Sequence, residues 1–109
     1  MGRQAIGLVP YAQEAAALMG SNVRIERINR GWTVIELAAR AGCSRHTVAA
    51  VERAHAAVAF GHVLNICAAL GIQLFVSDPV ELARLGRTQQ QMLRLMPKRV
   101  HPILTGCLG

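Results

Sequence analysis

Hydrophobic positions recur with a helical period over most of this sequence. The first periodic run extends from about Ala12 to Arg30, and Gly31 supplies the left-handed residue with which many helices end. Gly20-Ser21-Asn22 is the one point at which this run allows an interruption. The spacing predicts a first helix whose inward stripe consists of Leu18, Ile25, Ile28 and Trp32.

Two short helices with a very tight turn between them are predicted next. Thr33 is a suitable N-cap for the first, because Glu36 three residues later completes a capping box, and Gly42 ends this helix. Ser44 is a suitable N-cap for the second, which extends from about Arg45 to Arg53. The predicted inward residues of the pair are Leu37, Ala38, Ala41, Val48 and Val51.

A fourth helix and a short strand are predicted in the middle of the chain. The helix covers about Phe60 to Leu70 and ends at Gly71. A segment rich in β-branched and aromatic residues follows, in which the period changes from helical to alternating. The helix is expected to turn Phe60, Val63, Leu64 and Cys67 inward, and the strand is expected to contain Ile72, Leu74 and Val76.

A last helix begins at Asp78-Pro79 and runs to about Met96, where Pro97 stops it. Its apolar stripe consists of Leu82, Leu85, Met92 and Met96. The chain is therefore predicted to contain a flexible arm at 1–11, a helical domain at 12–71, a strand and C-terminal helix at 72–97, and a flexible tail at 98–109.

Composition supports an all-α fold with a basic surface. The 109 residues suffice for one domain with an extension, 52% of them are hydrophobic, and only 4% are aromatic. The 12 basic residues, all arginine except Lys98, outnumber the 6 acidic ones and give a net charge of +6. Such a surface attracts polyanions, and arginine forks suit both phosphates and guanine edges.

Several other functions have little support in the sequence. No targeting segment and no membrane-spanning run are recognised, so a cytoplasmic protein is expected that binds no membrane. The 3 cysteines and 4 histidines lack the spacing of a zinc site, and neither a phosphate loop nor a catalytic motif is present. We therefore expect no metal, no cofactor and no enzymatic activity. Cys43 and Cys67 are expected to pack as small hydrophobic residues.

The two short helices carry the informative motif. Two helices joined by a tight glycine turn, with small Ala38 at their crossing and a polar start to the second, are typical of a helix-turn-helix. From about Val23 to Leu70 the chain resembles the XRE, or lambda-repressor-like, family of transcriptional regulators. The resemblance rests on GWT at 31–33, ELAARAGCSRHTV at 36–48, VER at 51–53 and ALG at 69–71. It implies a lambda-repressor-like domain that dimerises and binds palindromic double-stranded DNA operators.

The resemblance also implies roles for individual residues. Arg45, His46, Thr47 and Ala50 occupy base-reading positions, with Arg45 suited to guanine and Ala50 to a thymine methyl group. Ser44 and Arg53 are expected to contact phosphates. Relatives form a partly buried ion pair at the positions of Arg27 and Glu52.

One position departs from the family pattern. The second helix of relatives usually opens with Thr-Gln, and the glutamine contacts the DNA backbone there. This chain has Val34 at that position, and Ala49 and Ala50 of the third helix are apolar too. Readout is therefore expected to rest on Arg45, His46 and Thr47.

The C-terminal run from Ala59 to Val100 points to one subgroup of this family. With LGIQLF, DPVELARL and LRLMPKRV it is similar to HipB-like antitoxins, which accompany HipA-like kinase toxins. This similarity implies a homodimer in which Ile72, Leu74 and Val76 pair across the two copies, because a single strand in a helical domain has no partner of its own. Two functions follow: an autoregulating repressor and antitoxin, or a protein-interaction module that neutralises a kinase and binds DNA weakly.

Overall fold

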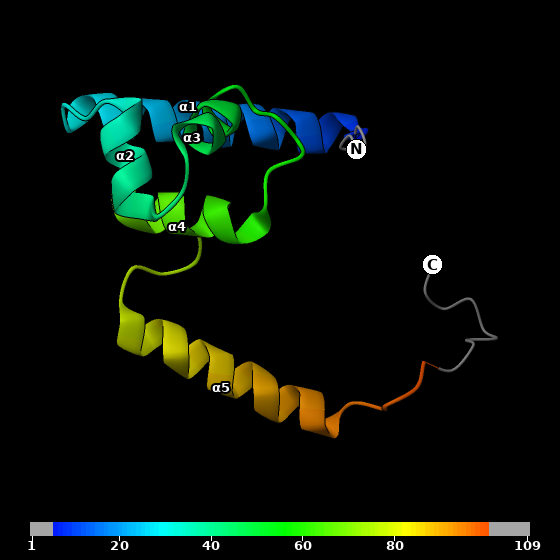
Figure 1. Cartoon of the computed structure of the whole chain (residues 1–109). Coiled ribbons are helices and arrows are strands. Elements are labelled where there is room, and N and C mark those ends of the chain that lie inside the picture. The colour runs from blue at the N-terminus through cyan, green and yellow to red at the C-terminus, as the bar shows by residue number, and fades with distance from the viewer. Residues whose placement is uncertain (1–5, 101–109) are drawn as a thin grey trace. The chain divides into compact units, whose positions relative to one another are not determined.

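The computed structural model describes residues 6–100. These residues form five helices, and no strand is found among them: α1 (Pro10–Asn29), α2 (Val34–Ala41), α3 (Arg45–Glu52), α4 (Phe60–Leu70) and α5 (Pro79–Leu95) (Figure 1). The chain divides into two units, the first ending at Leu74 and the second beginning at Phe75. The predicted all-helical class is confirmed over this range.

The ends of the helices lie where local sequence signals place them. Thr33 and Glu36 form the capping box at the start of α2, and Ser44 caps α3 by accepting a hydrogen bond from the backbone of Thr47. Gly42 and Gly71 end α2 and α4 in left-handed conformations, with φ of 72° and 71°. The bounds of α2, α3 and α4 therefore agree with the prediction to within one residue.

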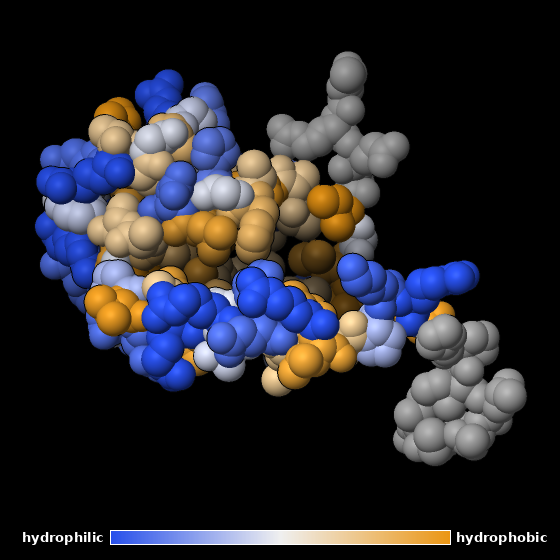
Figure 2. Space-filling model, turned by 90° about the horizontal axis from the view of Figure 1, so that it is seen from below, coloured by the Kyte–Doolittle hydropathy of each residue, from blue (hydrophilic) through white to orange (hydrophobic). Residues whose placement is uncertain are grey.

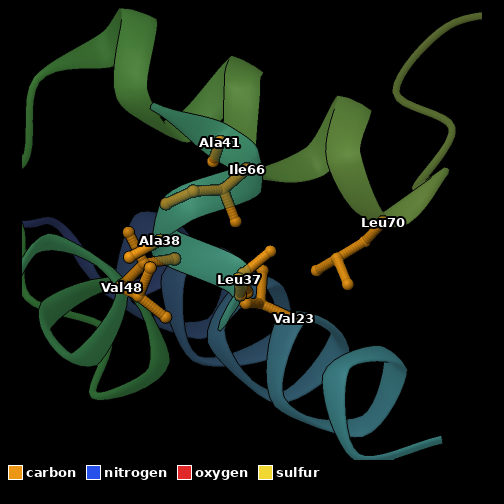
Figure 3. Packing of buried hydrophobic residues seen from close by; sticks show 8 residues of the cluster. Val23, Leu37, Ala38, Ala41, Val48, Ile66 and Leu70 are labelled. Atoms are coloured by element: carbon orange, nitrogen blue, oxygen red, sulfur yellow. The ribbon is translucent and has the colours of Figure 1, made fainter. Parts of the chain in front are cut away.

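One hydrophobic core holds α1 to α4 together. The packing joins α1 to α3 and α4, and α2 to α3 and α4. Figure 3 shows side chains from all four helices converging on this core. Arg30, which follows the last residue of α1, adds a polar contact between distant segments, since it donates to the carbonyl oxygen of Leu70 at the end of α4. The buried residues of the cluster are Val23, Leu37, Ala38, Ala41, Val48, Val51, Ile66 and Leu70.

The inward stripe predicted for α1 is wrong except at Trp32, which is half-buried against the core. Leu18, Ile25 and Ile28 are between 53% and 64% exposed, whereas Gly20 and Val23 are the buried residues of the helix. The helix is also continuous through 20–22, where a break was allowed, and it begins at Pro10, inside the predicted arm. The physical reason is that α3 crosses α1 at Gly20, where any side chain would collide with backbone atoms of α3.

The core face predicted for α4 is only partly right. Cys67 is buried and Val63 is half-buried, but Phe60 is 76% exposed. Ile66, which the prediction omitted, is fully buried together with Leu70. Because Phe60 opens the first turn of α4, it lies beyond the edge of the surface that α1 and α2 cover.

The predicted strand at Ile72, Leu74 and Val76 is not found in the described part of the chain, in which 72–76 is irregular. Ile72 packs against the core of the first unit, while Leu74 is 39% exposed. A strand needs a neighbouring strand for its backbone hydrogen bonds, and none is available within residues 6–100. The segment serves as the link between the two units.

The second unit contains α5, whose start is well defined. Pro79 occupies the first turn, and the Asp78 carboxylate accepts a hydrogen bond from the backbone N–H of Val80 at 3.1 Å. None of the residues of α5 is buried. No helix within the described residues is long and apolar enough to cross a membrane. Of the predicted arm and tail, 1–5 and 101–109 lie outside the described residues.

Candidate nucleic-acid interface

The connection between α2 and α3 is short and is held by local hydrogen bonds. Gly42 lies in the left-handed region, and the next residue, Cys43, donates its backbone N–H to the carbonyl of Ala38 at 3.0 Å. Ser44 then starts α3, with Thr47 N–H donating to its hydroxyl oxygen at 3.1 Å. These local hydrogen bonds, together with the left-handed Gly42, fix the path of the chain between α2 and α3.

A largely buried ion pair holds α3 to α1. Arg27 Nε lies 2.6 Å from Glu52 Oε2, and Arg27 Nη2 lies 3.1 Å from Glu52 Oε1, so the contact is bidentate. The two side chains are 13% and 8% exposed. Arg27 also donates to the carbonyl of Trp32, and the hydrogen bond that Arg27 donates to the Glu52 carboxylate raises the pKa of Arg27. This network holds both ends of the helix-turn-helix against α1.

The two sides of α3 have different characters. Val48 and Val51 are buried in the core, while the side chains of Arg45, His46 and Arg53 are exposed. The exposed cationic Arg45 lies in the first turn, at the positive end of the helix dipole. This face can therefore donate hydrogen bonds to an anion or to the acceptors of a base edge.

The remaining residues predicted to lie at this face are already hydrogen-bonded or are half-buried. Ser44 Oγ and Thr47 Oγ1 are 3.0 Å apart and are hydrogen-bonded to each other, so both hydroxyls already have one partner. Thr47 and Ala50 are half-buried. Arg45 and His46 are thus the residues of the predicted set best exposed at the start of α3, and Arg53 is exposed at its end.

An apolar groove next to Arg45 and His46 was not predicted. It has a volume of about 480 Å³ and lies between the start of α2 and the outer face of α3. Val34 and Ile35 supply one wall, and Ala49 supplies part of the other. The spacing of four residues from Arg45 to Ala49 places the two on one helix face, and this signal could have identified Ala49 in the sequence.

The cysteines do not contribute reactive groups to this face. Cys67 is buried and Cys43 packs against the core, and burial raises the pKa of both thiols. The thiolate is the reactive form, so both are held in their less reactive state at neutral pH. No three His, Cys, Asp or Glu side chains within the described range are grouped as a metal site would require. Cys107 lies outside that range.

Comparison with known proteins shows the family to which the chain belongs. A family model described as a helix-turn-helix domain matches residues 18–75. The chain is 36% identical over 91 residues to a protein of Neisseria meningitidis serogroup B described as a hypothetical transcription factor, which covers 82% of this chain and 85% of that one. The crystal structure of the hypothetical transcription factor NHTF from Neisseria is also similar, with 32% identity and a TM-score of 0.52, and the match covers 76% of this chain and 96% of that one. With its capped α2, tight turn and exposed α3 inside the matched range, the chain belongs to the helix-turn-helix family of DNA-binding transcriptional regulators.

Proposed function

We propose that this protein is a homodimeric repressor that binds a palindromic operator and reads it with α3. The observation that carries this proposal is the exposed polar start of α3, held in a fixed orientation by the turn at Gly42 and by the Arg27–Glu52 pair. A net charge of +6 favours association with the phosphate backbone. The similarity to a Neisseria protein described as a hypothetical transcription factor is consistent with such a role.

Different residues of α3 have different tasks in this proposal. Arg45 donates two hydrogen bonds to a guanine, and His46 contacts a neighbouring base or phosphate. Arg53, at the far end of α3, contacts a phosphate. Ser44 and Thr47 each have one hydroxyl partner already, so any phosphate contact they make uses their remaining hydrogen-bonding capacity. Ala50 offers a small apolar surface to the base edges.

The homodimer is supported by α5. This helix buries none of its residues, and Leu82 and Met92, which lie on one stripe, are 46% and 60% exposed. Together with Leu85 and Gln89, these residues are spaced alternately by three and four positions, which is the period of a seam between two helices. An amphipathic helix of this kind is stable in water only when another surface covers its apolar stripe.

A second copy of α5 matches the chemistry of this seam. The arginines of α5 lie away from it, so like charges do not oppose each other in the pair. On the face that Figure 2 turns to the viewer, hydrophilic and hydrophobic residues lie side by side. Parallel pairing brings Gln89 against Gln89 of the second copy, and a single polar pair at such a position sets the register. We therefore assign the dimer contact to α5 in place of residues 72–76.

The dimer is tested by sedimentation of two matched variants. Leu85→Asp introduces a charge into the seam and is expected to shift the protein toward monomer. Arg87→Asp carries the same low helix propensity on the opposite face and is expected to leave the dimer intact. Equal behaviour of the two variants, or a monomeric wild-type protein at micromolar concentration, would contradict the assignment.

Repression would follow from occlusion. Two α3 helices about 34 Å apart, one turn of B-DNA, would read the two halves of an inverted repeat and block access to a promoter. The test is binding of the full chain to DNA upstream of its own gene and to a scrambled duplex, followed by fluorescence anisotropy across a salt series. Tighter binding to the upstream DNA by about 10³-fold is expected for a specific regulator. Equal, salt-sensitive binding to both duplexes would show phosphate contacts without readout.

A second candidate function is neutralisation of a HipA-like kinase toxin. The exposed stripe of Leu18, Ile25 and Ile28 on α1 favours it, because a row of apolar side chains on a helix suits a protein partner. This function is compatible with repression, since the stripe lies on α1 and the proposed DNA contacts lie on α3. Co-expression with a kinase encoded beside the gene tests it: a stable complex that the variant Ile25→Asp abolishes is expected.

A further inference from the structure

The groove beside Arg45 has a chemical character that a phosphate contact does not explain. Its walls include Val34, Ile35 and Ala49, and most of its lining is apolar. Ile35 is 60% exposed, although it lies next to a surface expected to face a polyanion. Burial of this side chain against a charged phosphate would be unfavourable, because desolvation of the phosphate would gain no hydrogen bond in return.

The major groove of DNA presents one apolar group for such a surface to contact. The edges of the bases there carry hydrogen-bond donors and acceptors, with the 5-methyl group of thymine as the exception. A methylated cytosine carries the same group at the same position. The groove is broadly open to solvent, so the edge of a base can bring its methyl group against these side chains.

The cationic side chain of Arg45, at the rim of the groove, restricts which base can lie next to the methyl group. Arg45 and His46 line the same groove as the three apolar residues. A guanidinium group is best satisfied by the N7 and O6 acceptors of a guanine. Because Arg45 and the apolar residues line one groove, a pyrimidine methyl group in the groove and a guanine at Arg45 would be neighbouring bases, as in a pyrimidine–guanine step.

We propose that the groove formed by Val34, Ile35 and Ala49 binds the 5-methyl group of a pyrimidine that adjoins the guanine read by Arg45. The site thus prefers a thymine–guanine step and accepts 5-methylcytosine–guanine over cytosine–guanine. This inference rests on the proposed function, since it requires α3 to enter the major groove. It assigns sequence specificity to Ile35 of α2, outside the recognition helix.

The test removes single methyl groups from a bound duplex. The full chain is first used to select binding sequences from a randomised duplex library, and each thymine of the selected sequence is then replaced in turn by deoxyuridine. One position in each half-site, next to a guanine, is expected to lose about fourfold in affinity, the effect of exposing one methyl group. Placing cytosine at that position is expected to weaken binding, and 5-methylcytosine is expected to restore it.

Two matched variants assign the effect to the groove. Ile35→Ala is expected to remove most of the difference between thymine and deoxyuridine, and because Ile35 is exposed the variant keeps the core intact. Ile28→Ala truncates a comparably exposed isoleucine on α1 and is expected to leave the difference unchanged. Specific binding that is insensitive to every methyl group, or a methyl effect that Ile35→Ala leaves intact, would overturn the inference. Failure to select any sequence would instead contradict the proposed function.

Discussion

Gly20 of α1 lies directly against the backbone carbonyl of Val51 in α3, so that a Cβ atom on Gly20 would stand 2.6 Å from the Val51 oxygen. The same Cβ would be 2.9 Å from the carbonyl oxygen of Glu52. Both neighbours are backbone atoms, which cannot rotate away as a side chain can. The close approach of α1 to α3 therefore depends on the absence of a side chain at this one position.

Gly20→Ala is expected to destabilise the protein by about 1–3 kcal/mol, the usual cost of overpacking. Helix propensity alone would favour alanine by about 1 kcal/mol, so a loss of stability isolates the steric effect. Urea denaturation followed by circular dichroism measures it. Gly61→Ala is the control, because a Cβ there meets nothing within 4 Å. A Gly20→Ala protein as stable as the control would contradict the close contact.

Breaking the Arg27–Glu52 pair is expected to be costly. Arg27→Met leaves the Glu52 carboxylate 8% exposed and without its partner, and the expected loss in unfolding free energy is about 3–5 kcal/mol. The double variant Arg27→Met/Glu52→Leu is expected to recover much of this loss, because no uncompensated charge stays buried. Arg84→Met, which breaks the exposed Glu81–Arg84 pair, is expected to change stability little. Additive losses in the double variant would contradict the coupling.

Ala54 occupies a position that favours glycine. The N–H of His55 donates to the carbonyl of Ala50, and the N–H of Ala54 donates to that of Val51, which is the Schellman arrangement at the end of α3. Ala54 therefore adopts a φ of 60°. Ala54→Gly is expected to stabilise the protein by about 1 kcal/mol, because the left-handed conformation costs an alanine roughly that amount. Thermal unfolding checks this against Ala68→Gly in α4, where a loss of stability is expected.

Arg45 and Arg53 are expected to differ in their effects on DNA binding. Arg45→Ala should weaken binding to the specific duplex by about 1–3 kcal/mol and affect a scrambled duplex much less, because a base contact is lost. Arg53→Ala should weaken binding to both duplexes by similar factors and reduce the salt dependence. Fluorescence anisotropy measures both effects. An equal loss on both duplexes for Arg45→Ala would reassign this residue to the DNA backbone.

Local signals allowed most helix boundaries to be predicted from the sequence. The capping box of Thr33 and Glu36, the cap at Ser44 and the left-handed glycines act within one or two turns of chain, so neighbouring residues suffice to identify them. The same signals located α2, the turn and α3, and therefore the polar start of the recognition helix. The apolar groove escaped prediction because Val34 and Ile35 approach Ala49 only when α2 and α3 are packed together.

What the sequence by itself determined is the set of helices and the turn that orients α3, because caps, glycines and hydrophobic period are properties of short segments. Tertiary structure alone decided which side of α1 is buried, since α1 carries apolar residues on more than one side. Period alone cannot choose between the stripe with Leu18 and Ile25 and the one with Gly20 and Val23. The contact of Gly20 with the Val51 carbonyl decides which stripe is buried, because only a residue without a side chain lets the backbones of α1 and α3 approach so closely.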